Sequence, residues 1–516
     1  MFGLLRRQTG DYLSVITLLR WARDDARLRG VHIRCDDLQA NWARLQGLRR
    51  SLERLRAAGK HVWVHLERAG VREYYLASAA ERVSLTPATT LDVTGLSSEA
   101  IFLLDALQKV GVQADVVQMG RYKSAGEMFV RRDMSAPHRE MMESLVDDLY
   151  GQVVDAVSAS RRLEPDAVRE RLGRGPYIPA EAQAAGLVDA IAYADESERD
   201  LTAACGGAPT IDRTAYAARR GREMRLEALR RQRATLALLY VGGTIKPGES
   251  FPGPEGARAT GSATVAAALE QVRKRDDIGA VVVRVASPGG SVLGSDLIWR
   301  DMLRTRETKP VVVSFGDVAA SGGYYIALAG TSVLAEAGTI TGSIGVIAGK
   351  ATLRGVYDRL GVRKELVSRG RHATMNSDYV PLDEEAHERI RTQAEAFYRD
   401  FLAKVSTARG LSDDASAAAA EGRVWTGRQA LERGLVDELG GLEEAFASAK
   451  RAMGVASDEP VNIERFPKPR RLWKLSVDLN LPNQGALLEL INVLPSLRFL
   501  LRERVWAVLP FSLRFF

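Results

Sequence analysis

Short apolar runs rich in β-branched residues alternate along the chain with longer stretches in which apolar residues recur every three or four positions. The runs at residues 281–285 and 311–314 predict buried strands, and the stretches at 264–275 and 296–304 predict amphipathic helices. Strands separated by helices of this length favour βαβ crossovers, which place the strands parallel in one sheet. The pattern therefore predicts an α/β fold with a largely parallel sheet.

The same pattern occurs twice. Residues 28–34 resemble residues 278–284, and residues 59–64 resemble 309–314, both at an offset of 250. The offset persists at Gly120-Arg121, which corresponds to Gly370-Arg371, and then slips by two, so that residues 186–189 match residues 434–437. Such a register predicts a tandem duplication of one domain.

We predict four segments from this repeat. They are an N-terminal repeat at 1–195, an Arg-rich linker helix at 196–234, a C-terminal repeat at 235–455 and a basic, apolar tail at 456–516. Residues 219–233 in the linker contain seven arginines and two glutamates, which is typical of an exposed, solvated helix. The strand predicted at 235–240 would have its counterpart before Met1, so we expect the first repeat to lack its opening strand or the chain to begin earlier.

Composition narrows the possible functions. With 46% hydrophobic and 27% charged residues, the chain is expected to fold, and a net charge of +7 from 72 basic and 65 acidic residues is too small for its length to indicate nucleic acid. Cys35 and Cys205 are far apart, without a CxxC motif or a Cys/His cluster. We therefore predict no metal, no cofactor and no nucleic-acid partner.

The two copies differ at particular positions, and these differences are reciprocal. Ser321 in the second copy corresponds to Val71, whereas Lys123 in the first copy corresponds to Ala373. The loop at residues 287–291, Ser-Pro-Gly-Gly-Ser, has no glycine pair at residues 37–41. This pattern is expected if an ancestral homodimeric hydrolase had Ser and Lys in every subunit, the two subunits fused, and each half then lost one of the two residues.

Serine and lysine can together cleave an acyl bond. A serine hydroxyl becomes nucleophilic when a base removes its proton, and a buried lysine with a lowered pKa is such a base. Backbone N–H groups of Gly322, Gly289 and Gly290 could stabilise the oxyanion, because glycine leaves the approach open. Taken alone, Ser-Gly-Gly and Pro-Gly-Gly are usually turns, and a single lysine is usually a surface charge.

These segments resemble the bacterial signal peptide peptidase A family, also called protease IV, in its long, duplicated form. The likeness extends over residues 11–450 and is strongest at Gly120-Arg121-Tyr122-Lys123-Ser124-Ala125, Ser287-Pro288-Gly289-Gly290-Ser291, residues 316–324, and Thr341-Gly342-Ser343-Ile344-Gly345. The resemblance implies a fold of the Clp-protease and crotonase type, Ser321 as nucleophile, Lys123 as general base and Ser343 as the residue that orients the lysine. Consistent with that role, Ser343 corresponds to Val93 in the other copy.

The resemblance further implies a serine endopeptidase that acts through an acyl-enzyme on signal-peptide remnants and other hydrophobic or unfolded peptides. It implies a homo-oligomer at the cell envelope, associated with the inner membrane. Family members of this type usually begin with a transmembrane anchor, which we do not find at this N-terminus, so a cytoplasmic location is open. No stretch of the tail has the ~18 uninterrupted apolar residues of a span, but its Arg-flanked segments could lie in a membrane interface or pack on the body.

Two other functions stay open at this point. A crotonase-like acyl-CoA enzyme would share the βαβ architecture and a glycine-lined oxyanion site, and it predicts carboxylates near that site. A non-catalytic, membrane-associated scaffold derived from the peptidase would explain the missing first strand. Cleavage specificity, oligomer number and whether Ser321 and Lys123 meet within one chain are not determined by the sequence.

Overall fold

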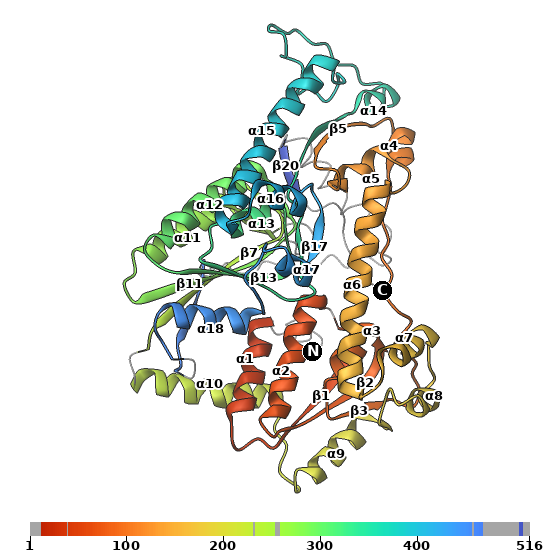
Figure 1. Cartoon of the computed structure of the whole chain (residues 1–516), viewed down its shortest axis with the longest axis vertical. Coiled ribbons are helices and arrows are strands. Elements are labelled where there is room, and N and C mark those ends of the chain that lie inside the picture. The colour runs from red at the N-terminus through yellow and green to blue at the C-terminus, as the bar shows by residue number, and fades with distance from the viewer. Residues whose placement is uncertain are drawn as a thin grey trace.

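A computed structural model describes residues 12–38, 40–230, 233–252, 258–456, 459–467 and 505–508 (Figure 1). The expectations for the N-terminus before residue 12 and for residues 468–504 and 509–516 of the tail lie outside this part of the chain. Within the described residues, no helix is long and apolar enough to cross a membrane. The same residues contain no group of three or more His, Cys, Asp or Glu side chains that could hold a metal ion.

A helix precedes the first repeat in the chain and packs against the second repeat. Ile16 of this helix, α1 (Tyr12–Asp24), lies in a core cluster with Leu236 and Leu238 of the second repeat. The elements of the first repeat are β1 (Gly30–Asp36), α2 (Trp42–Ala57), β2 (His61–Gly70), α3 (Val71–Ala77), β3 (Arg82–Leu85), β4 (Leu91–Asp92), α4 (Leu104–Val110), β5 (Gln113–Met119), α5 (Glu127–Val130), α6 (Ala136–Arg161), α7 (Pro165–Arg174), α8 (Pro179–Ala184), β6 (Ala190–Ile191) and α9 (Ala194–Ala204).

The second repeat follows the linker helix α10 (Arg213–Arg230) and has a longer opening. Its elements are β7 (Thr235–Gly242), β8 (Ile245–Lys246), β9 (Phe251–Pro252), β10 (Arg258–Gly261), α11 (Ser262–Arg273), β11 (Ile278–Ser287), β12 (Gly289–Ser291), α12 (Val292–Arg306), β13 (Val311–Ala320), α13 (Gly322–Ala327), β14 (Ser332–Ala335), β15 (Ile340–Gly342), β16 (Val346–Thr352), α14 (Arg354–Arg359), α15 (Glu384–Arg409), α16 (Asp413–Ala419), β17 (Val424–Thr426), α17 (Gly427–Glu432), β18 (Glu438–Leu439) and α18 (Leu442–Ala452). The tail after the repeat contains β19 (Asn462–Phe466) and β20 (Val505–Val508).

The elements confirm the duplication and its register. Strands β2 and β13 begin 250 positions apart, as do β3 and β14. Helices α6 and α15 have 26 residues each and begin 248 positions apart, so the slip of two falls before them. The predicted tandem α/β fold with largely parallel sheets is therefore confirmed.

Each repeat has its own sheet, which is parallel in the first repeat and parallel except for the β15–β17 pair in the second. In the first repeat the strand order is β1-β2-β3-β6, with β4 beside β2, and in the second it is β17-β15-β13-β11-β7-β19, with β14 beside β13. The central strands β11 and β13 are almost completely buried, because helices cover both faces of the sheet. Strand β7 has no counterpart before β1 among the described residues.

A third sheet joins the two repeats. Its order is β5-β16-β20-β12-β8-β10-β9, and β5 of the first repeat pairs antiparallel with β16 of the second from Met119↔Val346 to Gln113↔Thr352. This pairing attaches the segment after β5 to the second repeat.

Ion pairs add to the contact between the repeats. Arg50 on α2 donates to Glu336 at 2.7 Å and also pairs with Glu444. On the opposite side Arg428 pairs with Asp148 of α6 at 2.7 Å. Glu336 is almost fully buried, and burial raises the pKa of its carboxyl. Removing one partner of such a pair would leave an uncompensated charge, so these contacts hold the repeats in one arrangement.

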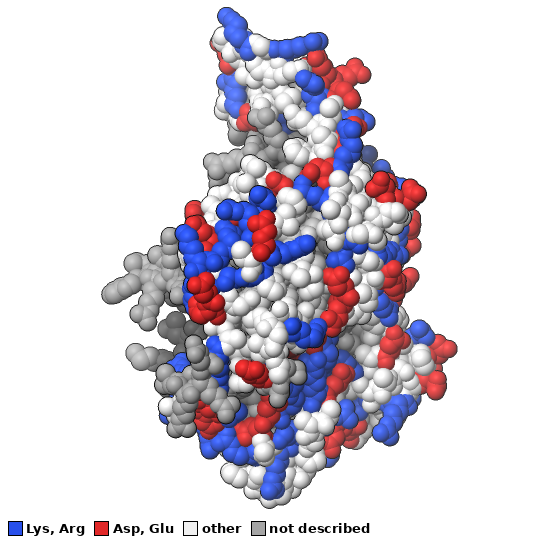
Figure 2. Space-filling view, turned by 60° about the vertical axis from the view of Figure 1, so that its left-hand side comes forward, with Lys and Arg blue, Asp and Glu red and all other residues white. Residues whose placement is uncertain are grey.

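Helix α10 is arginine-rich, and most of its described side chains up to residue 227 are exposed or half-buried. Its Glu223 pairs with Arg220 and with Arg27. On the face shown in Figure 2, basic and acidic side chains are interspersed over the upper part, and basic side chains gather lower down.

Candidate active site

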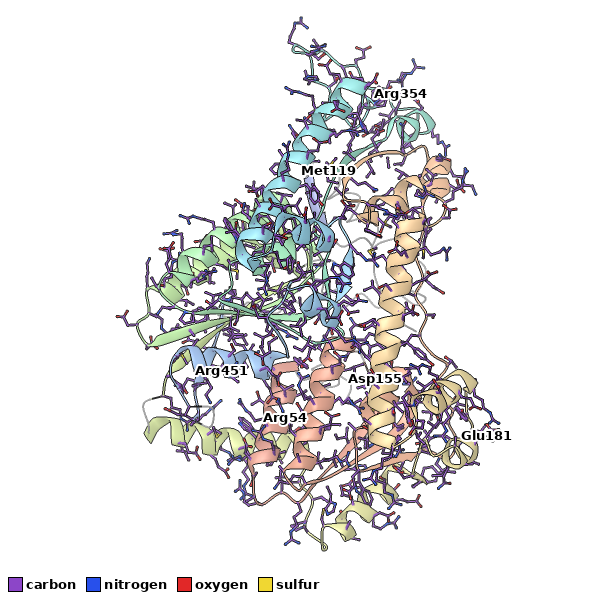
Figure 3. The ribbon with its side chains drawn as sticks, viewed as in Figure 1. Arg54, Met119, Asp155, Glu181, Arg354 and Arg451 are labelled. Atoms are coloured by element: carbon purple, nitrogen blue, oxygen red, sulfur yellow. The ribbon has the colours of Figure 1, made fainter. Side chains whose placement is uncertain are left out.

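Lys123 lies at the contact between the two repeats, just after the strand by which the first repeat pairs with the second. It follows β5, whose last residue, Met119, is labelled in Figure 3. The backbone N–H of Tyr122 donates to the carbonyl oxygen of Glu421 at 2.7 Å. A Cβ on Gly422 would lie only 2.5 Å from the Lys123 Cβ, and the φ of Gly422 is +74°. Glycine is therefore required there, both for the backbone conformation and for the close approach.

Ser321 lies at the junction between β13 and α13. Its φ is +53°, an uncommon conformation for a residue with a side chain, and its N–H donates to the carbonyl of Gly342 at 2.8 Å. Ser343 has the same φ of +53°, and its N–H donates to the carbonyl of Arg423 at 2.7 Å. Strained backbone at two serines that face one lysine is typical of a functional site.

These three side chains come together within one chain. The Lys123 Nζ lies 2.7 Å from the Ser321 Oγ, 2.8 Å from the Ser343 Oγ and 2.8 Å from the Ser343 carbonyl oxygen. All three residues are fully buried in the described structure. A neutral amine has two N–H donors and one lone pair. With its donors on Ser343, the lone pair can accept the Ser321 hydroxyl proton.

Burial lowers the pKa of the Lys123 amine well below its usual 10.5. Desolvation disfavours the ammonium form, and desolvation is the one cause that contributes to this shift. Among the described residues, the polar groups that contact the amine are hydroxyl and carbonyl oxygens and include no carboxylate that would stabilise the ammonium form. The arrangement therefore favours a neutral base beside the serine hydroxyl.

The predicted oxyanion glycines also converge. Gly322 follows Ser321 directly, and a Cβ on Gly322 would lie 3.2 Å from the Gly290 nitrogen and 3.2 Å from the Gly289 Cα. The N–H of Gly289 donates to the Ser287 Oγ at 3.1 Å, so in this structure that donor is already occupied. Gly290 pairs with Ile245 on one edge of β12 and with Ala507 on the other. Gly322, which directly follows Ser321, is thus the best-placed of the three glycines for binding an oxyanion, with Gly290 as the second candidate.

Sequence reasoning missed three residues of this site, which are Gly345, Ser295 and Gly422. A Cβ on Gly345 would lie 3.2 Å from the Lys123 Cδ, and a Cβ on Gly322 would lie 2.5 Å from the Ser295 Oγ. Gly422, the third, corresponds to Arg174 at the offset of 248. The comparison of copies that singled out Ser321 could therefore have found Gly422 as well, whereas Gly345 corresponds to Gly95 and gives no such signal.

Comparisons with known proteins agree with the duplication. The model of peptidase family S49 matches residues 54–205 and 304–456, one region in each repeat. Serine protease SPPA, chloroplastic, of Arabidopsis thaliana is 34% identical over 86% of this chain and 66% of its own length. Protease 4 of Salmonella typhi is 30% identical over 86% of this chain and 72% of its own length.

Among solved structures, a mutant of ClpP1 from Listeria monocytogenes matches 40% of this chain and 94% of its own, with 14% identity and a TM-score of 0.27. A superposition at that score does not by itself define the fold. The family match covers more than half of the chain, and the two relatives match most of it. The chain therefore belongs to peptidase family S49, and the relatives that it matches over most of its length are proteases.

Proposed function

We propose that this protein is a serine endopeptidase in which Ser321 is the nucleophile and Lys123 the general base. The observation that supports this most directly is the 2.7 Å contact between the Lys123 Nζ and the Ser321 Oγ, two residues 198 positions apart, in a fully buried site. Ser343 would hold the lysine amine, and Gly322 with Gly290 would bind the oxyanion.

The reaction would run through an acyl-enzyme. Lys123 accepts the Ser321 hydroxyl proton as the Oγ bonds to the substrate carbonyl carbon, and the carbonyl oxygen becomes an oxyanion. The C–N bond then breaks, and Lys123 returns the proton to the leaving amine. Water enters, loses a proton to Lys123 and attacks the ester, which releases the acid and restores the Ser321 hydroxyl.

Hydrophobic or unfolded peptides, including signal-peptide remnants, are the substrates that we propose from the family resemblance. Extended peptides suit this site because β12, which contains the oxyanion glycine Gly290, is a short strand in the inter-repeat sheet. The crotonase-like alternative predicts carboxylates beside the site, and the polar contacts of the Lys123 amine are to Ser321 and Ser343 instead.

The test is labelling with a fluorophosphonate probe together with turnover of an apolar fluorogenic peptide. We expect Ser321→Ala to abolish labelling and Lys123→Met to reduce it by at least ~100-fold. Lys309→Met is the matched control, since this buried lysine donates only to the carbonyls of Arg275 and Ile278. That variant is expected to lose stability and keep its labelling. Undiminished labelling of Ser321→Ala would refute the assignment.

We also propose that the protein acts as a homo-oligomer. Residues 363–369 correspond to β5 and residues 96–102 to β16, and among the described residues neither segment forms a named strand, although Ser98 makes a single β-bridge. Val367 is 91% exposed. Pairing of residues 363–369 with residues 96–102 of another copy would repeat the internal contact, so Val367→Asp should lower the mass measured by light scattering. Leu226→Asp, on exposed α10, is the control.

For location we propose the cell envelope, by the same resemblance, with peripheral membrane contact through the tail. Most of that tail lies outside the described residues. Flotation of the full chain with vesicles of zwitterionic and anionic phospholipid, compared with a chain that ends at residue 467, tests this proposal. Equal flotation of the two chains would count against a role of the tail.

A further inference from the structure

Strand β20 is separated in sequence from every other described element and lies in the middle of the inter-repeat sheet. It pairs antiparallel with β12, with Ser291↔Trp506, Gly290↔Ala507 and Gly289↔Val508. On its other edge it pairs antiparallel with β16, with Ile347↔Trp506 and Ala348↔Val505. In Figure 1 this short strand is drawn between α15 and β5. The C-terminal tail thus supplies the strand that joins β12 to β16.

Both neighbours of β20 belong to the candidate active site. Strand β12 contains Gly289 and Gly290, which lie against Gly322 beside the nucleophile. Strand β16 begins three residues after Ser343, which contacts the lysine amine. Strand β20 also contacts α13, the helix that follows Ser321. The four residues 505–508 are therefore enclosed by the segments that hold the catalytic groups.

The space taken by β20 has the width of one extended chain. Neighbouring strands lie about 4.8 Å apart, so β12 and β16 are separated by about two strand spacings. Without β20, the backbone N–H and C=O groups on the facing edges of both strands would lack these partners. An extended peptide of almost any sequence could satisfy them, because this pairing is made by the main chain.

From this arrangement we propose that residues 505–508 are an intramolecular competitor for the substrate site: the C-terminal tail occupies the slot between β12 and β16, and substrate must displace it. The inference rests on the proposed peptidase function and adds a form of self-regulation to it. The tail offers the same chemistry as the proposed substrates, an extended apolar peptide with the sequence Val-Trp-Ala-Val.

The tail can reach the slot from its own body. Residues 468–504 connect the end of the described body at Pro467 to Val505, and a segment of that length can extend up to about 120 Å. Linkage within one chain gives an effective concentration on the order of 1 mM. If the strand binds with a Kd of about 0.1 mM, competition within the chain raises the apparent KM about tenfold.

The kinetic test compares the full chain with a chain that ends at residue 504. We expect KM for an apolar fluorogenic peptide to fall about tenfold on truncation while kcat stays unchanged. Ala507→Pro tests the same idea at full length, because proline lacks the N–H and is excluded from a strand paired on both sides. Ser512→Pro, beyond β20, is the matched control and should behave like the full chain. Intact-mass measurement verifies that the tail is uncut during the assay.

A second measurement does not depend on catalysis. In a Ser321→Ala background, a fluorescent peptide with the sequence of residues 501–512 should bind the truncated chain about tenfold more tightly than the full chain. The same peptide with proline at position 507 should bind neither chain. These binding results hold even if Ser321 is not a nucleophile, so they separate failure of this inference from failure of the proposed function.

Three results would overturn the inference. One is an unchanged KM in both the truncated chain and Ala507→Pro, with no binding of the 501–512 peptide. Another is loss of folding on truncation together with lost activity in Ala507→Pro, which would make β20 a structural strand. The third is inhibition that grows with protein concentration, which would assign the strand to a second copy.

Discussion

Gly422→Ala tests how closely the position of Lys123 depends on the second repeat. The new Cβ would lie 2.5 Å from the Lys123 Cβ and 2.6 Å from its backbone nitrogen. Carbon atoms in contact prefer about 3.5 Å, so the Lys123 backbone must move by about 1 Å. A displacement of that size at a catalytic group costs about 100-fold in rate. We therefore expect kcat/KM to fall about 100-fold.

Gly454→Ala is the matched control for this substitution. Gly454 has a φ of +71°, close to the +74° of Gly422, but no atom lies within 4 Å of its added Cβ in the described structure. Both variants place alanine in the left-handed region at about 1–2 kcal/mol, so both should lose similar conformational stability. Only Gly422→Ala adds the overlap with Lys123.

The measurement is kcat/KM on an apolar peptide beside the midpoint of thermal unfolding for both variants. The reasoning predicts a lower midpoint for each and a large loss of activity for Gly422→Ala alone. If Gly422→Ala retained kcat/KM within threefold of Gly454→Ala, Gly422 would not position Lys123. If both variants lost the same activity, the loss would be explained by the strain of alanine in the left-handed backbone region and not by the overlap with Lys123.

Three further predictions concern the lysine and its surroundings. In the proposed mechanism Lys123 acts as a base in its neutral form, and burial lowers its pKa, so kcat/KM should fall with unit slope as pH drops through that pKa, well below 10.5. A flat profile down to pH 4 would contradict this role. Lys123→Met should not lower the midpoint of thermal unfolding at pH 7. As pH falls from 10.5 to 7, the variant should become more stable relative to the wild type, because only the wild-type chain binds an extra proton at this position on unfolding. Calorimetry across this pH range measures the trend. Ser343→Ala removes the hydroxyl contact with the Lys123 amine and leaves the carbonyl contact in place, so kcat should fall about tenfold. Ser343→Thr keeps a hydroxyl and should therefore have a higher kcat than Ser343→Ala.

Much of this protein is predictable from its sequence because the duplication provides an internal comparison. The constant offset and its slip of two correspond to real elements, as β2 with β13 and α6 with α15 demonstrate. Copy differences at Ser321 and Lys123 marked candidate chemistry without any knowledge of the fold. Glycine loops were recognisable too, because a pair such as Gly289-Gly290 is absent from the other copy.

Other features depend on contacts between segments far apart in the chain. The sequence shows neither that β5 pairs with β16 nor that β20 enters between β12 and β16, because hydrophobic periodicity identifies strands but not their partners. The comparison of copies can single out Gly422, but only the folded structure shows that its neighbour is Lys123.

The amino-acid sequence by itself thus determined the repeat, the fold class and the two residue types that divide the candidate chemistry between the halves. The tertiary structure decided that Lys123 and Ser321 meet within one chain at 2.7 Å, that burial lowers the pKa of the lysine amine, and that residues 505–508 of the tail lie in the inter-repeat sheet. The physical reason is that desolvation and strand pairing are properties of the surroundings of a group. Those surroundings come from both repeats and exist only once the chain has folded.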